Sequence, residues 1–269
     1  MNHKIAVHFA DKSLLQPANP VLINIIGAGG TGSQVLTAMA RINHSLIALA
    51  HPGLWVQLFD DDRVTPANLG RQLFAESELG FHKAVALINR VNRFFGTNWK
   101  AVTKKYNRKN AGVLPHGGAA TITISCVDTV AARFEIAGMI SQLKNDLTNH
   151  AHKPVYWMDF GNSQYSGQVI LATVGSVRQP ASKMYQTVEK LPSVTDEYKE
   201  LLTEAETTDD TPSCSLADAL TKQDLFINTV LANMGASLLW NFIKTGMTEN
   251  RGFFVNLKDF KTQALKVQL

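Results

Sequence analysis

Residues 22–36, LINIIGAGGTGSQVL, pass from a continuous apolar run through a cluster of glycines into a pattern typical of a helix. A short apolar run bounded by glycines is typical of a strand buried on both faces, as in parallel sheets. The turn that follows aims backbone N–H groups and the positive end of a helix dipole at one place. The stretch predicts a strand–turn–helix unit of an α/β sheet. Its glycines either receive an anion or only allow a tight turn.

The chain continues as an alternation of strand-like and helix-like segments. We expect strands at 21–26, 54–59, 100–103, 121–127, 155–160 and 168–174, and helices at 31–50, 83–95, 131–143 and 216–244. This alternation predicts a Rossmann-like, doubly wound and mostly parallel sheet with helices on both faces.

The later part of the chain follows a different pattern. The segment 168–174 is a candidate to pair antiparallel with 155–160, and GFFVNL with ALKVQ predicts a hairpin near the C-terminus. Residues 175–213 are polar and contain several prolines, which favours a long crossover loop with one helix near 196–205. Residues 1–20 show no pattern. We therefore expect a C-terminal antiparallel extension, a long crossover loop and a long C-terminal helix.

Composition excludes several classes of function. Of the 269 residues 45% are hydrophobic, enough for a full core, and the net charge of +4 comes without a long basic run. The short run KKYNRK is typical of a solvated face, so no nucleic-acid partner is expected. With no signal peptide and no apolar run near the roughly 20 residues of a membrane span, we expect a cytoplasmic protein without a membrane partner. Two cysteines are too few for a four-cysteine zinc site, so no zinc is expected.

The glycine turn by itself leaves the ligand open. A turn of this kind fits NAD, FAD, S-adenosylmethionine and ATP alike. Asp60 begins an acidic triplet with Asp61 and Asp62 at the end of the second expected strand, where a carboxylate can bind ribose hydroxyls. The glycines of the turn are Gly27, Gly29, Gly30 and Gly32. Together these features predict a nucleotide site.

The segment 60–84, DDDRVTPANLGRQLFAESELGFHKA, narrows the choice of nucleotide. Arg71 offers a planar fork and Lys83 a point charge, which together can neutralise a triphosphate and the charge developing on its α-phosphorus. Asn68 and Gln72 lie in the same segment. Hydride transfer needs no such clamp, whereas attack at the α-phosphate does. The segment therefore disfavours a nicotinamide dehydrogenase.

These motifs resemble the ThiF/MoeB family, the adenylating domain shared with ubiquitin-activating enzymes. They follow one another in the family's order: GAGGTGS, DDDRVTPANLGRQ (60–72), the G-x-x-K-A of Gly80–Ala84, the SCVD of Ser125–Asp128, and a cysteine in or after a long crossover loop. The resemblance covers residues 21–175 well and the remainder loosely. It implies one domain over 1–269, with a nucleotide-binding core (21–175), a crossover loop (176–213), and a C-terminal helix and hairpin (214–269).

The resemblance also implies roles for individual residues. The phosphates would lie against Gly29 and Gly32, the ribose would bind Asp60, and Asp128 would ligate Mg²⁺. Catalytic roles would fall to Arg71, Lys83, Asp128 and Cys214. The remaining nucleotide-binding candidates are Gly27, Gly30, Asp62, Asn68 and Gln72. For Asp128 the residues leave open a second role, as the N-cap of the helix expected near 131.

The local sequence around each of the two cysteines indicates a different role. Cys126 has apolar neighbours and is expected to be inert core. Cys214, in TPSCSLADAL, stands where a helix is expected to begin, and a helix N-terminus favours the thiolate. Asp209 and Asp210 oppose that effect. The resemblance implies that Cys214 takes the activated carboxyl group as a thioester or carries sulfur; the alternative is a free cysteine that only begins a helix.

The family resemblance implies a small ubiquitin-like protein as substrate, a conjugating-enzyme-like acceptor and a homodimer. The stretch PSCSLADAL…Q…N (212–228) resembles ThiF-family proteins of the PRTRC cassette, which are encoded beside a ubiquitin-like protein. Two alternatives stay open. The same fold could adenylate a small molecule, a peptide or a tRNA base, or the chain could be a non-catalytic ATP-binding scaffold.

Overall fold

The computed structural model describes residues 4–70, 72–145, 153–200, 202 and 223–269. Its main sheet has eight strands in the order β11-β10-β7-β6-β5-β2-β3-β4. These strands are β2 Val21–Ile26, β3 Leu54–Phe59, β4 Lys100–Val102, β5 Ile122–Ser125, β6 Tyr156–Asn162, β7 Ser166–Thr173, β10 Asn250–Asn256 and β11 Lys261–Lys266.

The sheet is parallel from β6 to β4 and antiparallel from β6 to β11. This confirms the mostly parallel, Rossmann-like core, the antiparallel pairing of 155–160 with 168–174 and the C-terminal hairpin. All six residues of β2 are buried, because helices cover the central strands on both faces.

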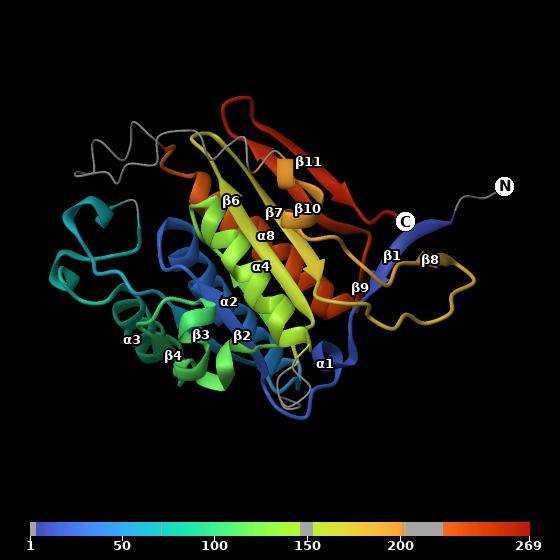
Figure 1. Ribbon diagram of the computed structural model, residues 1–269, viewed down its shortest axis with the longest axis horizontal. Coiled ribbons are helices and arrows are strands. Elements are labelled where there is room, and N and C mark those ends of the chain that lie inside the picture. The colour runs from blue at the N-terminus through green and yellow to red at the C-terminus, as the bar shows by residue number, and fades with distance from the viewer. Residues whose placement is uncertain (1–3, 71, 146–152, 201, 203–222) are drawn as a thin grey trace.

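Helices occupy both faces of the sheet (Figure 1). On one face α2 Gly30–Ala48, α3 Lys83–Phe95 and α8 Ile227–Thr245 enclose the larger core, which includes Ile23, Val35, Leu36, Leu231 and Phe242. On the other face α4 Val130–Asn145 encloses a second core, which includes Ile26, Phe59, Ile136, Met139 and Trp157. Short 3-10 helices lie at Pro66–Asn68, Glu76–Glu78, Arg108–Val113 and Pro115–Gly118. Within the described residues no helix is long and apolar enough to cross a membrane.

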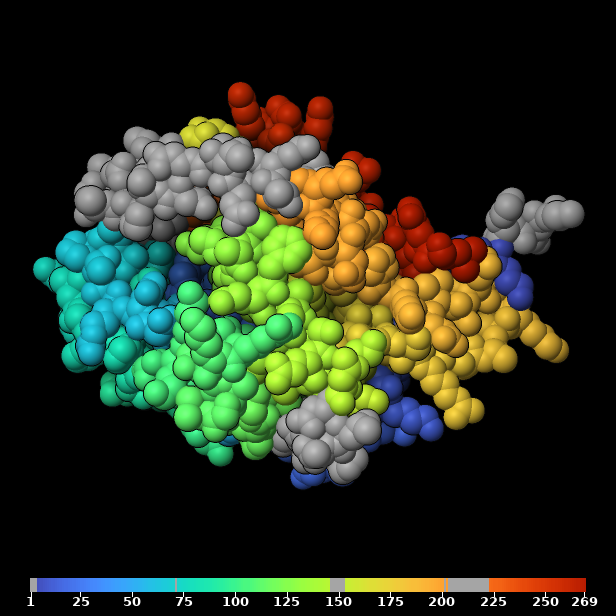
Figure 2. Space-filling view, viewed as in Figure 1, coloured from blue at the N-terminus to red at the C-terminus, as the bar shows by residue number. Residues whose placement is uncertain are grey.

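Three expectations need correction. Residues 1–20, which showed no pattern, contain strand β1 Ile5–Phe9 and the short helix α1 Lys12–Leu15. The crossover segment contains strand β8 Tyr185–Thr187, which was not expected, and helix α5 Val194–Glu197, which overlaps the start of the range 196–205 expected for its one helix. Figure 2 shows this segment, in orange, lying beside α4, in yellow-green.

The helix expected over 216–244 also differs. Residues 216–222 lie outside the described part, and α8 begins only at Ile227. Before it, the carboxylate of Asp224 accepts a hydrogen bond from the N–H of Phe226 at 2.8 Å, and this turn delays the start of the helix.

A small second sheet joins segments that are distant in sequence. Its order is β8-β1-β9, with β9 at Met247–Thr248. β1 pairs parallel with β8 and antiparallel with β9. Figure 1 shows β1 and β8 side by side at the end of the molecule opposite α3. Local pattern does not predict β1 or β8, because the partners that make each of them a strand come from far along the chain.

His8 anchors this sheet to the main one. Its ring is fully buried, with Nδ1 2.6 Å from the carbonyl oxygen of Val188 and Nε2 3.0 Å from the hydroxyl of Tyr156. A carbonyl only accepts, so Nδ1 carries the proton and Nε2 accepts from Tyr156. The Tyr156 oxygen in turn accepts the N–H of Asp11 at 2.9 Å. Burial lowers the pKa of His8 below its ordinary value. The hydrogen bond to Val188 raises this pKa, but by less.

We predict that acid destabilises the fold through His8. The unfolded chain binds this proton near the ordinary pKa of 6.5, whereas the folded chain resists it. The free energy of unfolding therefore falls as pH drops below about 6.5, until the lowered folded-state pKa is reached. Thermal unfolding between pH 7.5 and 5 measures this, and His8→Gln should weaken the dependence. The matched control is His44→Gln, at an exposed position. An unchanged pH profile in His8→Gln would contradict the assignment.

Candidate functional site

The glycine turn joins β2 to α2. At Gly27, Gly30 and Gly32 the packing of the protein itself leaves no room for a side chain. Gly27 has φ +95°, and a Cβ on it would lie 2.6 Å from the carbonyl oxygen of Cys126. A Cβ on Gly32 would lie 1.8 Å from the carbonyl oxygen of Gly27, and one on Gly30 would meet the side chain of Asn228 at 2.6 Å. Gly29 differs, because its φ is −78° and a Cβ on it would meet none of the described residues within 4 Å. The described part of the chain leaves the space over Gly29 open.

Asp60 follows β3 and holds two loops together. One carboxylate oxygen, Oδ2, accepts the N–H of Ala28 in the glycine turn at 2.6 Å, and Oδ1 accepts the N–H of Asp62 at 2.9 Å. Burial raises the pKa of the Asp60 carboxyl above its ordinary value, and the bond from Ala28 opposes that shift. The glycine turn and the acidic triplet therefore lie at the same edge of the sheet.

Lys83 lies at this edge because residues 81–83 form backbone hydrogen bonds with residues 62–64. The N–H of Val64 donates to the carbonyl of Phe81, and the N–H of Lys83 donates to the carbonyl of Asp62 at 3.0 Å. The ammonium of Lys83 lies 3.0 Å from Oδ2 of Asp62. Lys83 is buried, whereas the Asp62 side chain is 68% exposed.

The position of Lys83 is electrostatically unusual. It is the first residue of α3, where the helix dipole disfavours a cation, and the first turn contains no acidic residue. Lys83 therefore places a cation next to the glycine turn, in contact with the exposed carboxylate of Asp62 and in electrostatic interaction with the buried carboxyl of Asp60.

Asn68 and Gln72 lie in the loop between these elements. Oδ1 of Asn68 accepts from the N–H of Thr65 at 2.8 Å and from its hydroxyl at 3.0 Å, so this oxygen shapes the loop. Gln72 is buried, and its Oε1 has no hydrogen-bond partner in the described part of the chain. A buried oxygen without a partner is costly in free energy and is a feature of ligand sites. Arg71, between them in sequence, lies outside the described residues.

Asp128 is exposed in the turn between β5 and α4. Its alternative role, as the helix N-cap, belongs instead to Thr129, whose hydroxyl accepts the N–H of Ala132 at 3.3 Å. Asp128 lies close in sequence to Cys126, whose N–H donates to the carbonyl of Ile26 just before the glycine turn. Its carboxylate thus belongs to the edge that bears the carboxyl ends of the strands, where α/β sites form.

A buried ion pair supports the turn that carries Asp128. Nε of Arg133 lies 3.2 Å from Oδ2 of Asp159, and both side chains are almost fully buried. Nη2 of Arg133 donates to the carbonyl of Val127 at 2.7 Å, and Ser125 donates to the other Asp159 oxygen at 2.6 Å. The sequence reasoning missed this pair, because Arg133 lies within an ordinary helical pattern.

The two cysteines are in different situations. Cys126 directly follows β5, and burial raises the pKa of its thiol, consistent with an inert residue. Cys214, the candidate acceptor, lies outside the described residues.

Asp128 is the metal ligand that the sequence predicted, and its surroundings can be compared with the needs of Mg²⁺. Among the described residues no three His, Cys, Asp or Glu side chains come together to hold a metal. Mg²⁺ often binds through one or two carboxylates, with substrate phosphates and water completing its ligands. The exposed carboxylate of Asp128 fits that pattern.

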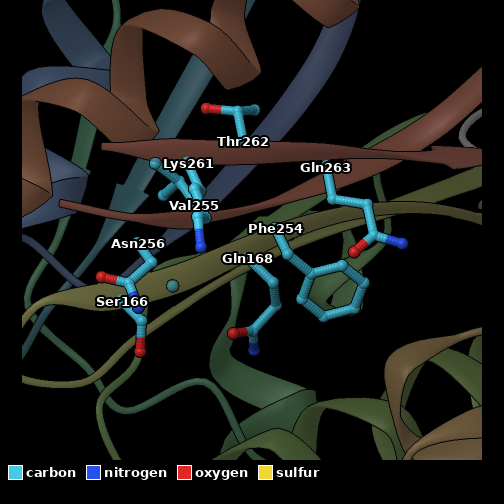
Figure 3. A pocket seen from close by; sticks show the side chains of 9 residues that line it. Ser166, Gln168, Phe254, Val255, Asn256, Lys261, Thr262 and Gln263 are labelled. Atoms are coloured by element: carbon cyan, nitrogen blue, oxygen red, sulfur yellow. The ribbon is translucent and has the colours of Figure 1, made fainter. Parts of the chain in front are cut away.

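A groove of about 630 Å³ lies elsewhere, over the antiparallel extension (Figure 3). Side chains of Gln168 on β7, Phe254 on β10, and Lys261 and Gln263 on β11 line it. None of the candidate site residues that the structure describes lines this groove. This groove is therefore separate from the glycine turn.

Comparisons with known proteins agree with this architecture. The chain is 27% identical to ubiquitin-like modifier-activating enzyme 5 of Culex quinquefasciatus over 132 residues, which is 45% of this chain and 31% of that protein. It thus spans less than a third of that relative's length.

Solved structures share the fold. PaaA matches with a TM-score of 0.58 and 14% identity, over 92% of this chain and 73% of that one. E. coli MccB matches with a TM-score of 0.57 and 16% identity, over 91% and 62%. The E. coli MccB structure with ATP matches with a TM-score of 0.52 and 16% identity, over 91% and 63%.

The model of the ThiF family matches residues 1–269, and the chain therefore belongs to the ThiF family.

Proposed function

We propose that this chain adenylates the C-terminal carboxylate of a small ubiquitin-like protein, using ATP and Mg²⁺, and that residues 1–269 form one adenylating domain. The observation that carries the proposal is the placement of Lys83. Its buried stem and ammonium lie at the start of α3, and Asp62 and Asp60 connect it through hydrogen bonds to the glycine turn. A cation so placed serves an anion with several charged oxygens better than a nicotinamide ring.

The reaction requires positioning and charge neutralisation. An oxygen of the substrate carboxylate attacks the α-phosphorus of ATP, the bond from that phosphorus to the bridging oxygen breaks, and pyrophosphate leaves with the electron pair. The carboxylate is already ionised, so no general base is needed. The backbone N–H groups of the turn, with Lys83 and Arg71, would stabilise the charge on the phosphate oxygens.

The other candidate residues have supporting roles in this proposal. Asp60 binds ribose, and Asn68 and Gln72 contact the phosphates; Asn68 would use its amide nitrogen, because its Oδ1 is bonded to Thr65. When bound, Mg²⁺ neutralises phosphate oxygens, and Asp128 would be its protein ligand.

A second step would use Cys214. Its thiolate attacks the acyl carbon of the adenylate, the bond to the AMP oxygen breaks, and a thioester forms with release of AMP. A conjugating-enzyme-like protein would then receive the acyl group. The homodimer and the cytoplasmic setting predicted from the sequence belong to the same proposal.

The comparisons support the choice of substrate. The Culex relative is by name an activating enzyme for a ubiquitin-like modifier, and one E. coli MccB structure contains AMPCPP with MccA. The resemblance of residues 212–228 to PRTRC proteins makes the ubiquitin-like product of a neighbouring gene the first partner to test.

We predict that Gly29→Ala weakens ATP binding without destabilising the fold. The new methyl group meets no atom of the described residues within 4 Å, so it enters the open space that a phosphate would need. We expect at least about a tenfold rise in the dissociation constant for ATP, measured by calorimetry. The midpoint of thermal unfolding should stay within about 2 °C of wild type. The control is Gly112→Ala, which also meets no atom and lies away from the turn. Equal ATP affinity in Gly29→Ala would count against a phosphate at this position.

We predict that Lys83→Met lowers the rate of ATP–pyrophosphate exchange by about 100-fold to 1000-fold. Methionine keeps the packing of the buried stem and removes the charge. The loss of the pair with exposed Asp62 should cost little stability. Lys266→Met, at an exposed position of β11, is the control. Wild-type exchange rates in Lys83→Met would contradict the catalytic role proposed for Lys83. Intact biological activity in a variant that has lost exchange would favour the scaffold alternative.

We predict that exchange depends on the ubiquitin-like partner. Incubation with ATP, Mg²⁺ and that partner should also give an adduct on non-reducing gels, which thiol reductant removes and Cys214→Ala abolishes. Exchange without the partner would favour a small molecule, peptide or tRNA base as substrate. Pyrophosphate release without an adduct would contradict the thioester step only.

A further inference from the structure

A buried amide cluster lies where α2 and α8 begin. Asn228, the second residue of α8, is 3% exposed. Its Oδ1 accepts from the hydroxyl of Thr31 at 2.8 Å and from Nδ2 of Asn162 at 3.3 Å, and its Nδ2 donates to Oε1 of Gln223 at 3.0 Å. One side chain therefore links the first turn of α2, the end of β6 and the residues that precede α8.

The same amide lies against the glycine turn. A Cβ on Gly30 would meet Nδ2 of Asn228 at 2.6 Å, so the absence of a side chain at Gly30 makes room for this amide. Gly30 and Thr31 are the first two residues of α2, and their N–H groups belong to the set that a helix leaves without internal partners. Asn228 thus fixes the turn from the side of α8.

The electrostatics at this point are also distinctive. The contact between Thr31 and Asn228 brings the N-termini of α2 and α8 together, and each end carries about half a positive charge. Acidic residues are favoured in first turns, yet neither helix has one there. Asn228 supplies a carboxylate-like acceptor to Thr31 without a negative charge. Carboxylates lie just outside the two first turns instead: Asp60 accepts the N–H of Ala28 before α2, and Asp224 accepts the N–H of Phe226 before α8.

We propose that Asn228 is a positioning residue of the nucleotide site. It holds the glycine turn in the geometry that receives phosphate, and as a neutral amide it adds no negative charge at the two helix N-termini. This inference rests on the proposed function, because it takes the ligand of the turn to be ATP.

The test compares Asn228→Asp with Asn233→Asp. Aspartate has the shape of asparagine and keeps the acceptor for Thr31 and Asn162, but it loses the donor to Gln223 and adds a negative charge beside the turn. Asn233 lies on the same helix at an exposed position and supplies the matched control. ATP and adenosine binding would be measured by calorimetry for the wild type and both variants, since adenosine carries no phosphate.

We expect Asn228→Asp to raise the dissociation constant for ATP at least about tenfold, with adenosine affinity within about twofold of wild type. Asn233→Asp should leave both affinities unchanged. Equal losses for ATP and adenosine would indicate a general structural role and overturn the inference, as would unchanged ATP binding. A wild-type chain that binds neither ligand would overturn the proposed function and this inference with it.

Thr31→Val keeps the test decisive if Asn228→Asp does not fold. Valine preserves the shape of threonine and removes the hydroxyl that donates to Asn228. The inference requires a smaller loss in the same direction, for ATP and not for adenosine. ATP binding equal to wild type in a folded Thr31→Val chain would contradict it.

Discussion

The hydrogen bonds accepted by Asp60 hold together the elements on which the site depends. One carboxylate receives N–H groups from the glycine turn after β2 and from the loop after β3. These loops leave adjacent parallel strands, so the bond fixes their spacing at the carboxyl edge of the sheet. Burial disfavours the charged form of this carboxyl, and the two N–H donors compensate for the water that it loses. Without them a charge at this position would be much less stable.

A second constraint follows from the charges around this carboxylate. Lys83 is placed at a helix N-terminus, with the positive ends of α2 and α8 in contact next to the same turn. Such an arrangement opposes the preferences of isolated helices, which favour acidic residues in first turns. Local rules are broken most often at functional sites. The first turns of all three helices carry no acidic residue.

The sequence predicted those parts of the fold that local pattern determines. The apolar spacing of 83–95 and the stop at Gly96 predicted α3, and Gly96 indeed adopts the left-handed conformation that ends this helix. The continuous apolar run of β2 predicted a strand covered on both faces. By contrast, β1 and β8 acquire their strand conformation from one another, across most of the chain. No pattern within either segment records such a partner.

The residues of the candidate site also divide into those that local sequence predicts and those that depend on contacts across the fold. Motif order identified Asp60, Asp62, Lys83 and the glycines, and the structure brings these residues into contact through neighbouring loops. The supporting residues could not be predicted, because their side chains act across the fold. Arg133 lies in a helix with a weak apolar stripe, yet it holds the turn that carries Asp128. Asn228 was part of a recognised stretch, but its role comes from its hydrogen bonds across the fold and its packing against Gly30.

The order of the strands has a consequence for association. An exposed sheet edge can template pairing with another chain, and proteins protect such edges with short strands and lysines. Here one edge is β4, with three residues and an exposed Lys100, and the other is β11, which begins and ends with a lysine. Pairing of two copies into one continuous sheet is therefore disfavoured at both edges. The homodimer proposed above would therefore join through helices and loops.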